Sequence, residues 1–399
     1  MNPNVMSPAQ DEDRPWNDWI PGVLSRRQVK VLCENDYIKD AVIGAIDHSA
    51  IDLHVSNEAY EFTNGSVKPF GDRYLLRIEK QKLVKRLDPQ SDGSFLLQPK
   101  KTYLFKTKES LFSSAFRGSP IYGQATAKSS VGRLDVLARL IVDGMDSYEE
   151  FDPKRASKGT GEMFLEVTPI TFKVRVKEGV ALSQLRFFCG KPSNAEVRGE
   201  ALYRTLLKDT LRRDGTLSVD LSNVEVSKGQ VAAAYRAKSD EYPDAVRLWK
   251  DGNVPLPNPS EYWELKAVDE QKRLTIKGSD FYILRSKEKI AVPPGIAVYC
   301  RAIDETIGEI RIHYAGFVHP FFGRNRDDDQ LGTPLIFEVR GHDIDVNLKD
   351  GEKLARLTFY RMSEDAKMEK EEEEKSKKAD EYKAQTLKLS HFFGKWPEK

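Results

Sequence analysis

Hydrophobic and polar residues alternate over short stretches of the chain, and turn-forming residues separate these stretches. Residues 173–176 read Lys-Val-Arg-Val, and residues 344–348 read Ile-Asp-Val-Asn-Leu. A period of two is typical of a strand with one buried face. Because glycine, proline, asparagine and aspartate recur between such stretches, the pattern predicts a mainly β protein whose short antiparallel strands form barrels or sandwiches.

Few segments favour a helix. The sequence predicts helices only at Arg26–Glu34 and Ala195–Leu211, and Ser25 is a candidate N-cap of the first. Prolines at 255, 257 and 259 exclude a regular helix from Asp251–Glu261. We expect that segment to be a loop over the surface of the second half of the chain.

The two halves of the chain resemble each other. Four matches follow in the same order at offsets of 168 to 179 residues, which indicates an internal duplication of a unit of about 170 residues. The matched pairs are 96–109 with 275–288, 165–167 with 337–339, 179–187 with 351–359, and 51–53 with 219–221.

The duplication gives meaning to the length of 399 residues, which exceeds one ordinary core. We expect two tandem β-barrels flanked by a polar and a charged tail. The predicted boundaries are 1–23 for the N-terminal tail, 24–193 for the first barrel, 194–362 for the second, and 363–399 for a charged, disordered tail with a terminal Leu/Phe motif.

Charge and cysteine content exclude several classes of protein. The 63 basic and 62 acidic residues leave a net charge of +1, which argues against binding nucleic acid through an overall field. Three distant cysteines form neither a disulfide framework nor a CxxC zinc motif. The start of the chain lacks a secretory signal pattern, and the apolar stretch Ile290–Cys300 is too short to span a membrane. We therefore expect an intracellular protein, cytoplasmic or nuclear, that binds no membrane.

The first candidate site is the stretch Lys128–Arg133, which reads Lys-Ser-Ser-Val-Gly-Arg. Two hydroxyls, a glycine that permits close backbone approach and two flanking cations fit a phosphate-binding loop. From the residues alone, a polar turn before a helix explains the stretch equally well.

The second candidate site combines the segment His313–Gly323 with Glu338. Small residues in the segment let backbone groups face a flat ring, and its aromatic residues can cover that ring. Glu338 lies between Phe337 and Val339 in a predicted strand, so its side chain faces away from theirs. Geometry alone favours a solvated glutamate. If Glu338 instead lines a pocket, burial would raise its pKa toward the value that a general base needs.

Together the two stretches resemble the dCTP deaminase and dUTPase superfamily, and the double-length type of 2'-deoxycytidine 5'-triphosphate deaminase in particular. The similarity covers about residues 24–362 and is strongest at 128–135, at 281–284 and from Gly316 to Arg340. It implies two dUTPase-like barrels with a jelly-roll-like course, and a site that is shared between barrels.

The resemblance assigns roles to individual residues. It implies that Lys128, Ser129, Ser130, Gly132 and Arg133 hold a triphosphate, and that Ser129 and Arg133 help to activate water. Glu338 would carry the proton from the attacking water to the departing ammonia. The base and sugar would meet the hairpin, through His313, Ala315, Gly316, Phe317 and His319.

The two halves look complementary under this resemblance. The second half has Asp304–Glu309 where the phosphate loop should be, and carboxylates there would repel a triphosphate. The first half has an irregular segment, Asp143–Gly161, in place of the hairpin, although it keeps an equivalent glutamate, Glu166. We expect one productive site, with Glu338 as the base and Glu166 in a structural role, although Glu166 stays a candidate.

The resemblance also implies the cofactors and the reaction. The chain lacks the His/Cys arrangement of a zinc deaminase, so water would be activated without zinc, and Mg²⁺ would arrive with the triphosphate. The expected reaction is hydrolysis of dCTP to dUTP and ammonia, by a homo-oligomer that is a trimer or a dimer of fused barrels. The alternatives are a dUTP pyrophosphatase, a bifunctional enzyme, or a non-catalytic nucleotide-binding protein.

Two features leave room for those alternatives and for another partner. His319 occupies the place of an aspartate that contacts the deoxyribose in the family, and it would make affinity sensitive to pH near its pKa. At the C-terminus, Leu389, Phe392 and Phe393 follow the spacing of a motif that docks on the sliding clamp, with Thr386 in place of its usual glutamine. The alternative is that this terminal segment folds back onto the barrels.

Overall fold

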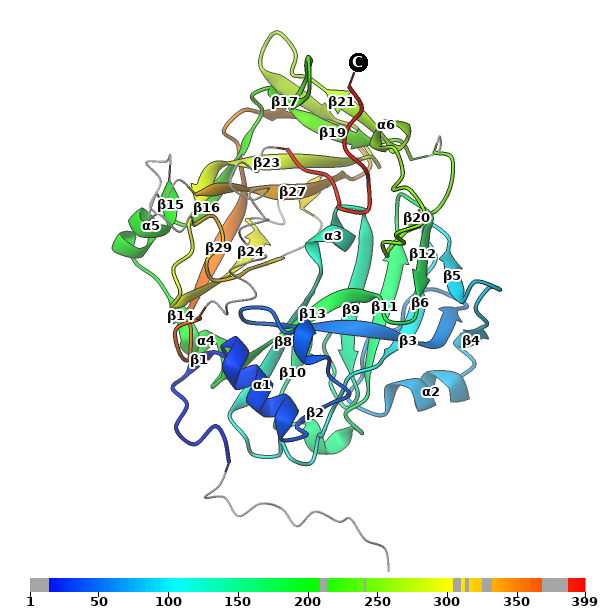
Figure 1. Ribbon diagram of the computed structural model, residues 1–399, viewed down its shortest axis with the longest axis vertical. Helices are drawn as coiled ribbons and strands as arrows, with labels where there is room; N and C mark the ends of the chain where they lie inside the picture. Colours follow the sequence, from blue (N-terminus) through cyan, green and yellow to red (C-terminus); the bar gives the residue numbers. More distant parts are fainter. Residues whose placement is uncertain are drawn as a thin grey trace, which may run out of the picture.

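The computed structural model describes residues 14–208, 214–239, 242–303, 310–312, 316–324, 332–367 and 387–398. In these residues the chain forms two barrel-like β units that lie side by side, and the C-terminal segment returns to pack where they meet (Figure 1). The prediction of a mainly β protein with two tandem barrels is confirmed.

Antiparallel strands that curl around one core form the first unit. Its main sheet has the order β10-β8-β13-β3-β6-β11-β9. The strands are β1 Gly22–Val23, β2 Ile38–Lys39, β3 Ile51–Phe62, β4 Val84–Leu87, β5 Ser94–Leu97, β6 Tyr103–Thr107, β7 Ser110–Leu111, β8 Ile121–Ala127, β9 Val136–Val142, β10 Glu150–Phe151, β11 Met163–Pro169, β12 Val174–Lys177 and β13 Ala181–Cys189.

A sheet of similar course forms the second unit, with the order β21-β19-β23-β16-β29-β24-β26 and β27 paired beside β23. Its strands are β14 Glu196–Val197, β15 Leu207–Lys208, β16 Thr216–Asp220, β17 Val224–Ser227, β18 Gln230–Ala232, β19 Ala234–Ala237, β20 Val246–Arg247, β21 Trp263–Lys266, β22 Arg273–Ile276, β23 Phe281–Ile290, β24 Ile296–Ala302, β25 Ile310–Ile312, β26 Gly316–Val318, β27 Thr333–Gly341, β28 Val346–Lys349 and β29 Lys353–Arg361.

Repeated contacts confirm the duplication. The Tyr103 hydroxyl accepts the Gln98 amide at 2.9 Å, and the Tyr282 hydroxyl accepts the Lys277 amide at 3.1 Å. The pairs β5–β12 and β22–β28, β11–β6 and β27–β23, and β8–β13 and β24–β29 also repeat. The same fold was therefore built twice from diverged sequences.

One of the four sequence matches is out of register. Ser183 pairs with Leu53, and its equivalent Ala355 pairs with Leu217, so Leu53 corresponds to Leu217 rather than to Leu221. The matched triplets 51–53 and 219–221 therefore differ by four residues from the structural alignment. A three-residue alternation recurs every second position in a strand and cannot fix the register by itself.

The helices are short, and only the first was predicted with correct bounds. Helix α1 spans Arg26–Glu34, and Ser25 caps it in a capping box with Gln28. The predicted helix at 195–211 is helical only at its first residue, which ends α4, and over α5, because two short strands interrupt it at 196–197 and 207–208; residues 209–211 lie outside the described residues. The other helices are α2 Tyr74–Lys80, α3 Ser129–Gly132, α4 Pro192–Ala195, α5 Glu200–Leu206 and α6 Pro259–Tyr262.

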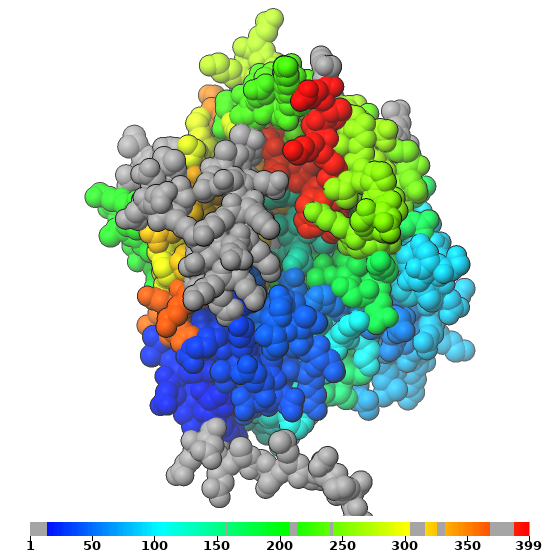
Figure 2. All heavy atoms as spheres, in the orientation of Figure 1, coloured from blue at the N-terminus to red at the C-terminus, as the bar shows by residue number. Residues whose placement is uncertain are grey.

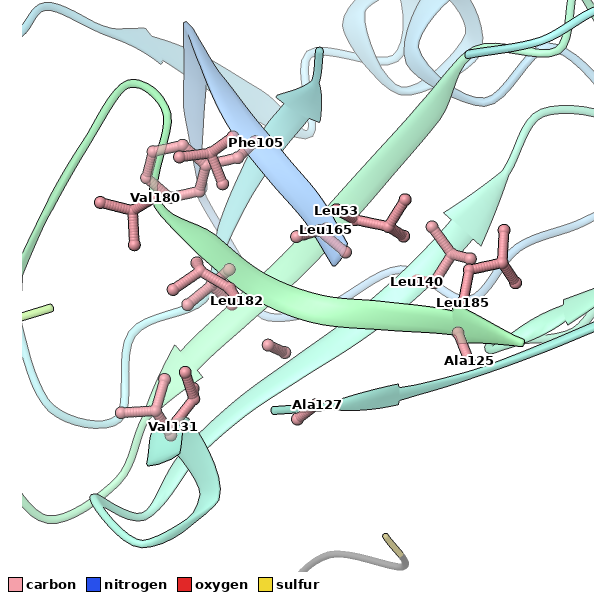
Figure 3. Packing of buried hydrophobic residues seen from close by; sticks show 14 of the residues in the cluster. Leu53, Phe105, Ala125, Ala127, Val131, Leu140, Leu165, Val180, Leu182 and Leu185 are labelled. Carbon is pink, nitrogen blue, oxygen red and sulfur yellow. The ribbon is translucent and has the colours of Figure 1, made fainter. Parts of the chain in front are cut away.

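The first core is closed at one end by the turn α3. Buried residues of β3, β6, β8, β9, β11 and β13 line this core, and Val131 of α3 lies at the edge of the same cluster (Figure 3). Val131 is fully buried, so this apolar contact holds the polar residues around it in place. Within the described residues, no helix is long and apolar enough to cross a membrane.

Segments of the second unit reach into the first. Strand β20 pairs in parallel with β12, and Tyr262 and Trp263 join the first core. The segment 251–261 was predicted as a surface loop of the second unit. Residues 251–258 do form a mostly exposed loop, but Pro259 begins the helical turn α6, because proline is well suited to the first position of a helix. A smaller cluster around Phe188 and Tyr360 packs the two barrels together.

Candidate active site between the two barrels

The predicted phosphate loop forms one turn of helix, α3, between β8 and β9. Lys128 precedes the turn as its N-cap, and its amide donates to the Leu182 carbonyl at 3.0 Å. Ser129 is exposed, whereas Ser130 and Gly132 are buried. The turn therefore combines an anchored backbone with an accessible hydroxyl at its start, next to a cation.

Two cations flank this turn and face different partners. The Lys128 ammonium pairs with Asp52 of β3 in the same barrel. The Arg133 guanidinium points to the second barrel, where its Nε lies 3.7 Å from Oε1 of Glu338. The sequence placed these residues 205 positions apart, and the fold brings them together within one chain.

Glu338 lies on β27 among buried residues of the second barrel. Its neighbours Phe337 and Val339 face the opposite side, as alternation predicted. The expectation that geometry alone makes Glu338 solvated is wrong, because its side chain is only 8% exposed. Arg133 of the first barrel approaches this face of the strand. Burial raises the pKa of Glu338 to about 7, although Arg133 acts in the opposite direction.

The hairpin strand β26 pairs with β24, whose Cys300 is the partner of Gly316. A methyl group at Gly316 would meet no atom of the described residues within 4 Å. Cys300 is close enough to Glu338 for the carboxylate to raise the pKa of its thiol, after burial as the main cause, to about 12. Within the described residues, the backbone at Gly316 therefore has space beside it, and its strand partner Cys300 interacts with Glu338. His313 and Ala315 lie outside the described residues.

His319 and Phe317 contact the first barrel. Arg186 of β13 is fully buried, lies 3.9 Å above the Phe317 ring and donates to the Ser49 hydroxyl at 3.2 Å. That hydroxyl lies 3.0 Å from Nδ1 of His319, and Nε2 of the ring lies 3.3 Å from the Gln184 side-chain oxygen.

This network fixes the state of the histidine. Nε2 faces two acceptors, the Gln184 side-chain oxygen at 3.3 Å and Oδ2 of Asp47 at 3.8 Å, so the neutral ring carries its proton on Nε2 and Nδ1 accepts from the Ser49 hydroxyl. Burial lowers the pKa of His319 to about 4; Asp47 opposes this shift, and Arg186 acts in the same direction as burial. The ring is therefore neutral near pH 7, so the pH sensitivity that we predicted at this position belongs to acidic conditions.

The C-terminal segment 387–398 packs against the phosphate loop, and folding back onto the barrels is one of the two arrangements that the sequence left open. The Ser390 hydroxyl donates to the Ser130 carbonyl at 2.7 Å, and Phe393 packs against Tyr262 at 5.1 Å between ring centroids. Figure 2 shows the segment, in red, packed beside yellow-green atoms of the second unit. Leu389 is half-buried, and Phe392 and Phe393 are buried. Thr386 lies outside the described residues.

Near the same segment lie two cations that sequence reasoning missed, Lys250 and Lys388. Burial lowers the pKa of His391 to about 4, and four neighbouring cations lower it further. They are Lys250, Lys128, Arg133 and Lys388. Lys250 and Lys388 belong to segments far apart in the sequence, so no local motif identified them. Positive charge thus gathers around α3, where an anion would be attracted.

Glu166 occupies the position of Glu338 in the first barrel but has closer partners. Its carboxylate binds the Arg139 guanidinium and accepts the Tyr148 hydroxyl at 2.8 Å, all within one barrel. The side chain is 1% exposed. These bonds satisfy the carboxylate in place, which favours the structural role that we expected.

The first barrel does have a hairpin at the place we described as irregular. Strand β10 pairs with β8 as β26 pairs with β24, which aligns Glu150 with Phe317 and Glu149 with Gly316. The description of 143–161 as wholly irregular is therefore wrong. Glu149 has φ +62° and is half-buried, and burial raises its pKa to about 7. A carboxylate thus replaces the glycine that leaves open space in the second barrel.

In the second barrel, Ile303 takes the position of Lys128. Its amide donates to the Leu354 carbonyl at 3.1 Å, as the Lys128 amide donates to Leu182. The cation before the phosphate loop is therefore absent at this place. The acidic stretch 304–309 that follows lies outside the described residues.

Comparison with known proteins identifies the family of the chain. The family model of the 2'-deoxycytidine 5'-triphosphate deaminase N-terminal domain matches residues 20–191, and that of the C-terminal domain matches residues 194–393. The crystal structure of 2'-deoxycytidine 5'-triphosphate deaminase from Agrobacterium tumefaciens is 27% identical with a TM-score of 0.74, over 87% of this chain and 97% of that chain. A search of curated proteins gives no match. The chain belongs to the 2'-deoxycytidine 5'-triphosphate deaminase family, as the resemblance indicated.

Proposed function

We propose that this chain hydrolyses dCTP to dUTP and ammonia at one site per chain, between α3 of the first barrel and β26 and β27 of the second. Membership of the deaminase family supports the reaction. The observation that carries the site is the buried carboxylate of Glu338, which lies 3.7 Å from Arg133 across the two barrels.

The triphosphate binds at α3. Lys128 and Arg133 supply charge, the hydroxyls of Ser129 and Ser130 supply hydrogen bonds, and Gly132 lets the backbone approach. The clustering of Lys250 and Lys388 with these cations around His391 supports an anionic ligand here. The cytosine then lies toward β26, where Gly316 leaves open space.

Glu338 acts as the base and then as the acid. The ionised carboxylate takes a proton from water as the water oxygen bonds to C4 of cytosine, and it returns that proton to the amino group, which leaves as ammonia. A carboxyl group whose pKa is raised to about 7 suits both steps near neutral pH. Ser129 and Arg133 assist by orienting the water and by stabilising charge.

The opposite combination, β10 with the loop after β24, lacks these features. Glu149 replaces Gly316 at the hairpin, and Ile303 replaces Lys128 before the loop. Glu166, the remaining equivalent, is engaged by Arg139 and Tyr148. These differences support one productive site per chain.

Mg²⁺ belongs to the substrate in this proposal. The side chains around α3 are mainly cations and hydroxyls, and Asp52 is engaged by Lys128, so they do not fit a resident metal ion. In the described ranges, no three His, Cys, Asp or Glu side chains converge as metal ligands. We place Mg²⁺ on the triphosphate oxygens, where it offsets their charge, and we expect no zinc.

The proposal extends to the assembly of the protein, its partners and its cellular location. We expect a homo-oligomer, a trimer or a dimer of fused barrels, in the cytoplasm or nucleus. Sliding-clamp docking through Thr386, Leu389, Phe392 and Phe393 would need the C-terminal segment to leave the barrels, since both phenylalanines are buried. Clamp binding that survives Phe392→Ala plus Phe393→Ala would contradict that docking mode.

Product analysis tests the function. The protein is incubated with Mg²⁺ and either dCTP or dUTP, and ammonia and pyrophosphate are measured separately. We expect dCTP to release ammonia, and we expect dUTP to release neither ammonia nor pyrophosphate. Pyrophosphate from dUTP would indicate the pyrophosphatase or bifunctional alternative, and no product from either nucleotide would favour a non-catalytic role.

Two matched variants test the site. Glu338→Gln should lower kcat for ammonia release by about 10²–10⁴, the range for loss of a general acid–base group. Glu166→Gln should retain kcat within about threefold, since its carboxylate does not face the open space. The reverse pattern would overturn the assignment of Glu338.

A further inference from the structure

Asp135 ends the turn that carries the phosphate loop, and its side chain binds the second barrel. It is fully buried, and Oδ2 accepts from the Thr171 hydroxyl at 2.5 Å and from Nη2 of Arg340. Nη2 of Arg340 also lies 2.5 Å from the Thr171 hydroxyl. Thr171 belongs to the first barrel and Arg340 to β27 of the second. One buried carboxylate therefore ties the two barrels together.

The backbone of Asp135 points to a role for its side chain. Asp135 has φ +58°, in the left-handed region that glycine enters without steric cost. Its amide donates to the Gly132 carbonyl at 2.8 Å and closes the turn after α3. Glycine would make that turn more easily, so the carboxylate is what the chain gains by having aspartate here.

The tie lies next to the proposed active site on both barrels. Arg133 and Asp135 are two residues apart at the end of α3, and Glu338 and Arg340 are two residues apart on the same face of β27. The two contacts have opposite polarity. In one, the first barrel supplies the cation, Arg133, and the second barrel supplies the carboxylate, Glu338. In the other, the first barrel supplies the carboxylate, Asp135, and the second barrel supplies the cation, Arg340. A shift of β27 by two residues would bring like charges together, so the pairs favour one alignment.

The two pairs differ in how tightly they hold. Asp135 and Arg340 are in direct hydrogen-bond contact, whereas Nε of Arg133 stays 3.7 Å from Glu338. A site assembled from two barrels needs its reacting groups aligned to about 0.5 Å. The tight pair can supply this alignment while it leaves Glu338 available to water and substrate.

We propose that Asp135 and Arg340 form a positioning pair that aligns Glu338 with Arg133 and α3. Only the expected change in kcat rests on the proposed deaminase function. The alignment itself is a property of the free protein. The ionisable groups that act on Glu338 in the described residues are Arg133 and Cys300.

Two substitutions of Asp135 separate the carboxylate from the backbone. Asp135→Asn keeps the size and tolerates the left-handed conformation, and Asp135→Gly relieves the backbone. Both should lower kcat at least tenfold with KM changed less than threefold, because substrate contacts remain while the reacting groups lose alignment. Arg340→Gln should change kcat and KM in the same way, because it removes the cation of the same pair. The matched control is Arg236→Gln, which breaks an ion pair to Asp280 at 2.6 Å within the second barrel and should leave kcat unchanged.

The pKa of Glu338 in the free protein gives a readout that is independent of turnover. It is measured by titrating protein labelled with ¹³C at the glutamate carboxyl, with Glu338→Gln to assign the signal. Loss of the Asp135 charge alone would lower this pKa, whereas loss of alignment with Arg133 would raise it. We expect Asp135→Asn to raise it by at least half a unit and Arg236→Gln to leave it unchanged.

The outcomes distinguish the two proposals. Folded Asp135→Asn or Asp135→Gly protein with wild-type kcat, or an Asp135→Asn pKa that falls or stays constant, would overturn the positioning pair. Wild-type protein that releases no ammonia from dCTP would overturn the function, and the titration would still decide the alignment. Thermal unfolding of each variant establishes that it is folded.

Discussion

Glu166 and Glu338 occupy equivalent strands in the two barrels, and each faces an arginine. Arg139 and Tyr148 hold Glu166 by direct hydrogen bonds within the first barrel. Arg133 approaches Glu338 from the other barrel and stays 3.7 Å away. Both carboxylates are buried, so burial alone does not separate their roles. What separates them is whether the buried charge is already satisfied.

A satisfied carboxylate stabilises the fold, whereas an incompletely satisfied one is ready to exchange a proton. Hydrogen bonds to the ionised form hold a carboxylate in that form, and desolvation without them raises the pKa. The pKa of Glu338 is raised to about 7 for this reason. Duplication thus allowed one copy of the glutamate to become structural while the other faced open space between the barrels.

The largest expected effect compares the two arginines. Arg133→Gln should lower kcat/KM for dCTP by about 10²–10³, because it removes a cation from both the triphosphate and the reacting centre. Arg139→Gln should keep kcat/KM within about threefold, since its partners among the described residues, Glu166, Tyr148 and Glu149, all lie in the first barrel. Ammonia release under steady-state conditions measures both. Equal losses in the two variants would contradict the comparison.

The sequence predicted the repeated β units, because alternation and the matched stretches recur over many residues. It also predicted the residues of the phosphate loop and Glu338 through the resemblance. The prediction failed where it depended on a single short stretch of sequence. The triplet 51–53 was matched four residues out of register, and the hairpin at β10 was missed because Glu149 replaced the glycine that marks it.

Other features depend on contacts between distant segments, and no local pattern encodes them. Alternation placed Glu338 on the face opposite to Phe337, but its position beside Arg133 depends on the docking of the first barrel. In the same way, Lys250 and Lys388 join the phosphate loop through the packing of the C-terminal segment. The tie between Asp135 and Arg340 joins residues 205 positions apart.

The next prediction concerns stability, where the two glutamates should respond with opposite sign at pH 8. The folded pKa of Glu338, about 7, exceeds its unfolded value of 4.5, so its contribution is fully present below pH 4.5 and is lost as pH rises through 7. At pH 8 the ionised group then costs up to about 3 kcal/mol. Glu338→Gln should therefore raise the free energy of unfolding at pH 8 relative to wild type, and this gain should shrink at pH 5.

Glu166→Gln is the matched variant for that measurement. It should destabilise the protein by about 1–3 kcal/mol at pH 8, because it weakens charge-assisted bonds to Arg139. Urea unfolding of wild type and both variants at pH 5 and pH 8 measures the effect. Destabilisation of the same size by both substitutions at pH 8 would show that Glu338 is as well satisfied as Glu166.

A smaller effect is expected in the pH dependence of turnover. Because Glu338 must be ionised to take a proton from water, kcat should fall about tenfold per pH unit below its pKa, near 7. Arg133 lowers that pKa, so Arg133→Gln should move the acidic limb to higher pH, and Arg139→Gln should leave it in place. Rate profiles from pH 5 to pH 9 at saturating dCTP provide the measurement. If Arg139→Gln moved the acidic limb and Arg133→Gln did not, the base would be Glu166.

The smallest effect is expected at Glu149, the residue that takes the place of Gly316 in the first barrel. Glu149→Gly removes a half-buried carboxylate and relieves a positive φ, so it should stabilise the protein by about 1 kcal/mol or less. It should not create a second site, because Ile303 still stands where Lys128 begins the phosphate loop. Binding of dCTP to Glu338→Gln and to Glu338→Gln plus Glu149→Gly, followed by calorimetry, should give one nucleotide per chain in both. Two nucleotides per chain in the double variant would mean that Glu149 alone separates the two hairpins, and that the loop after β24 still binds a triphosphate.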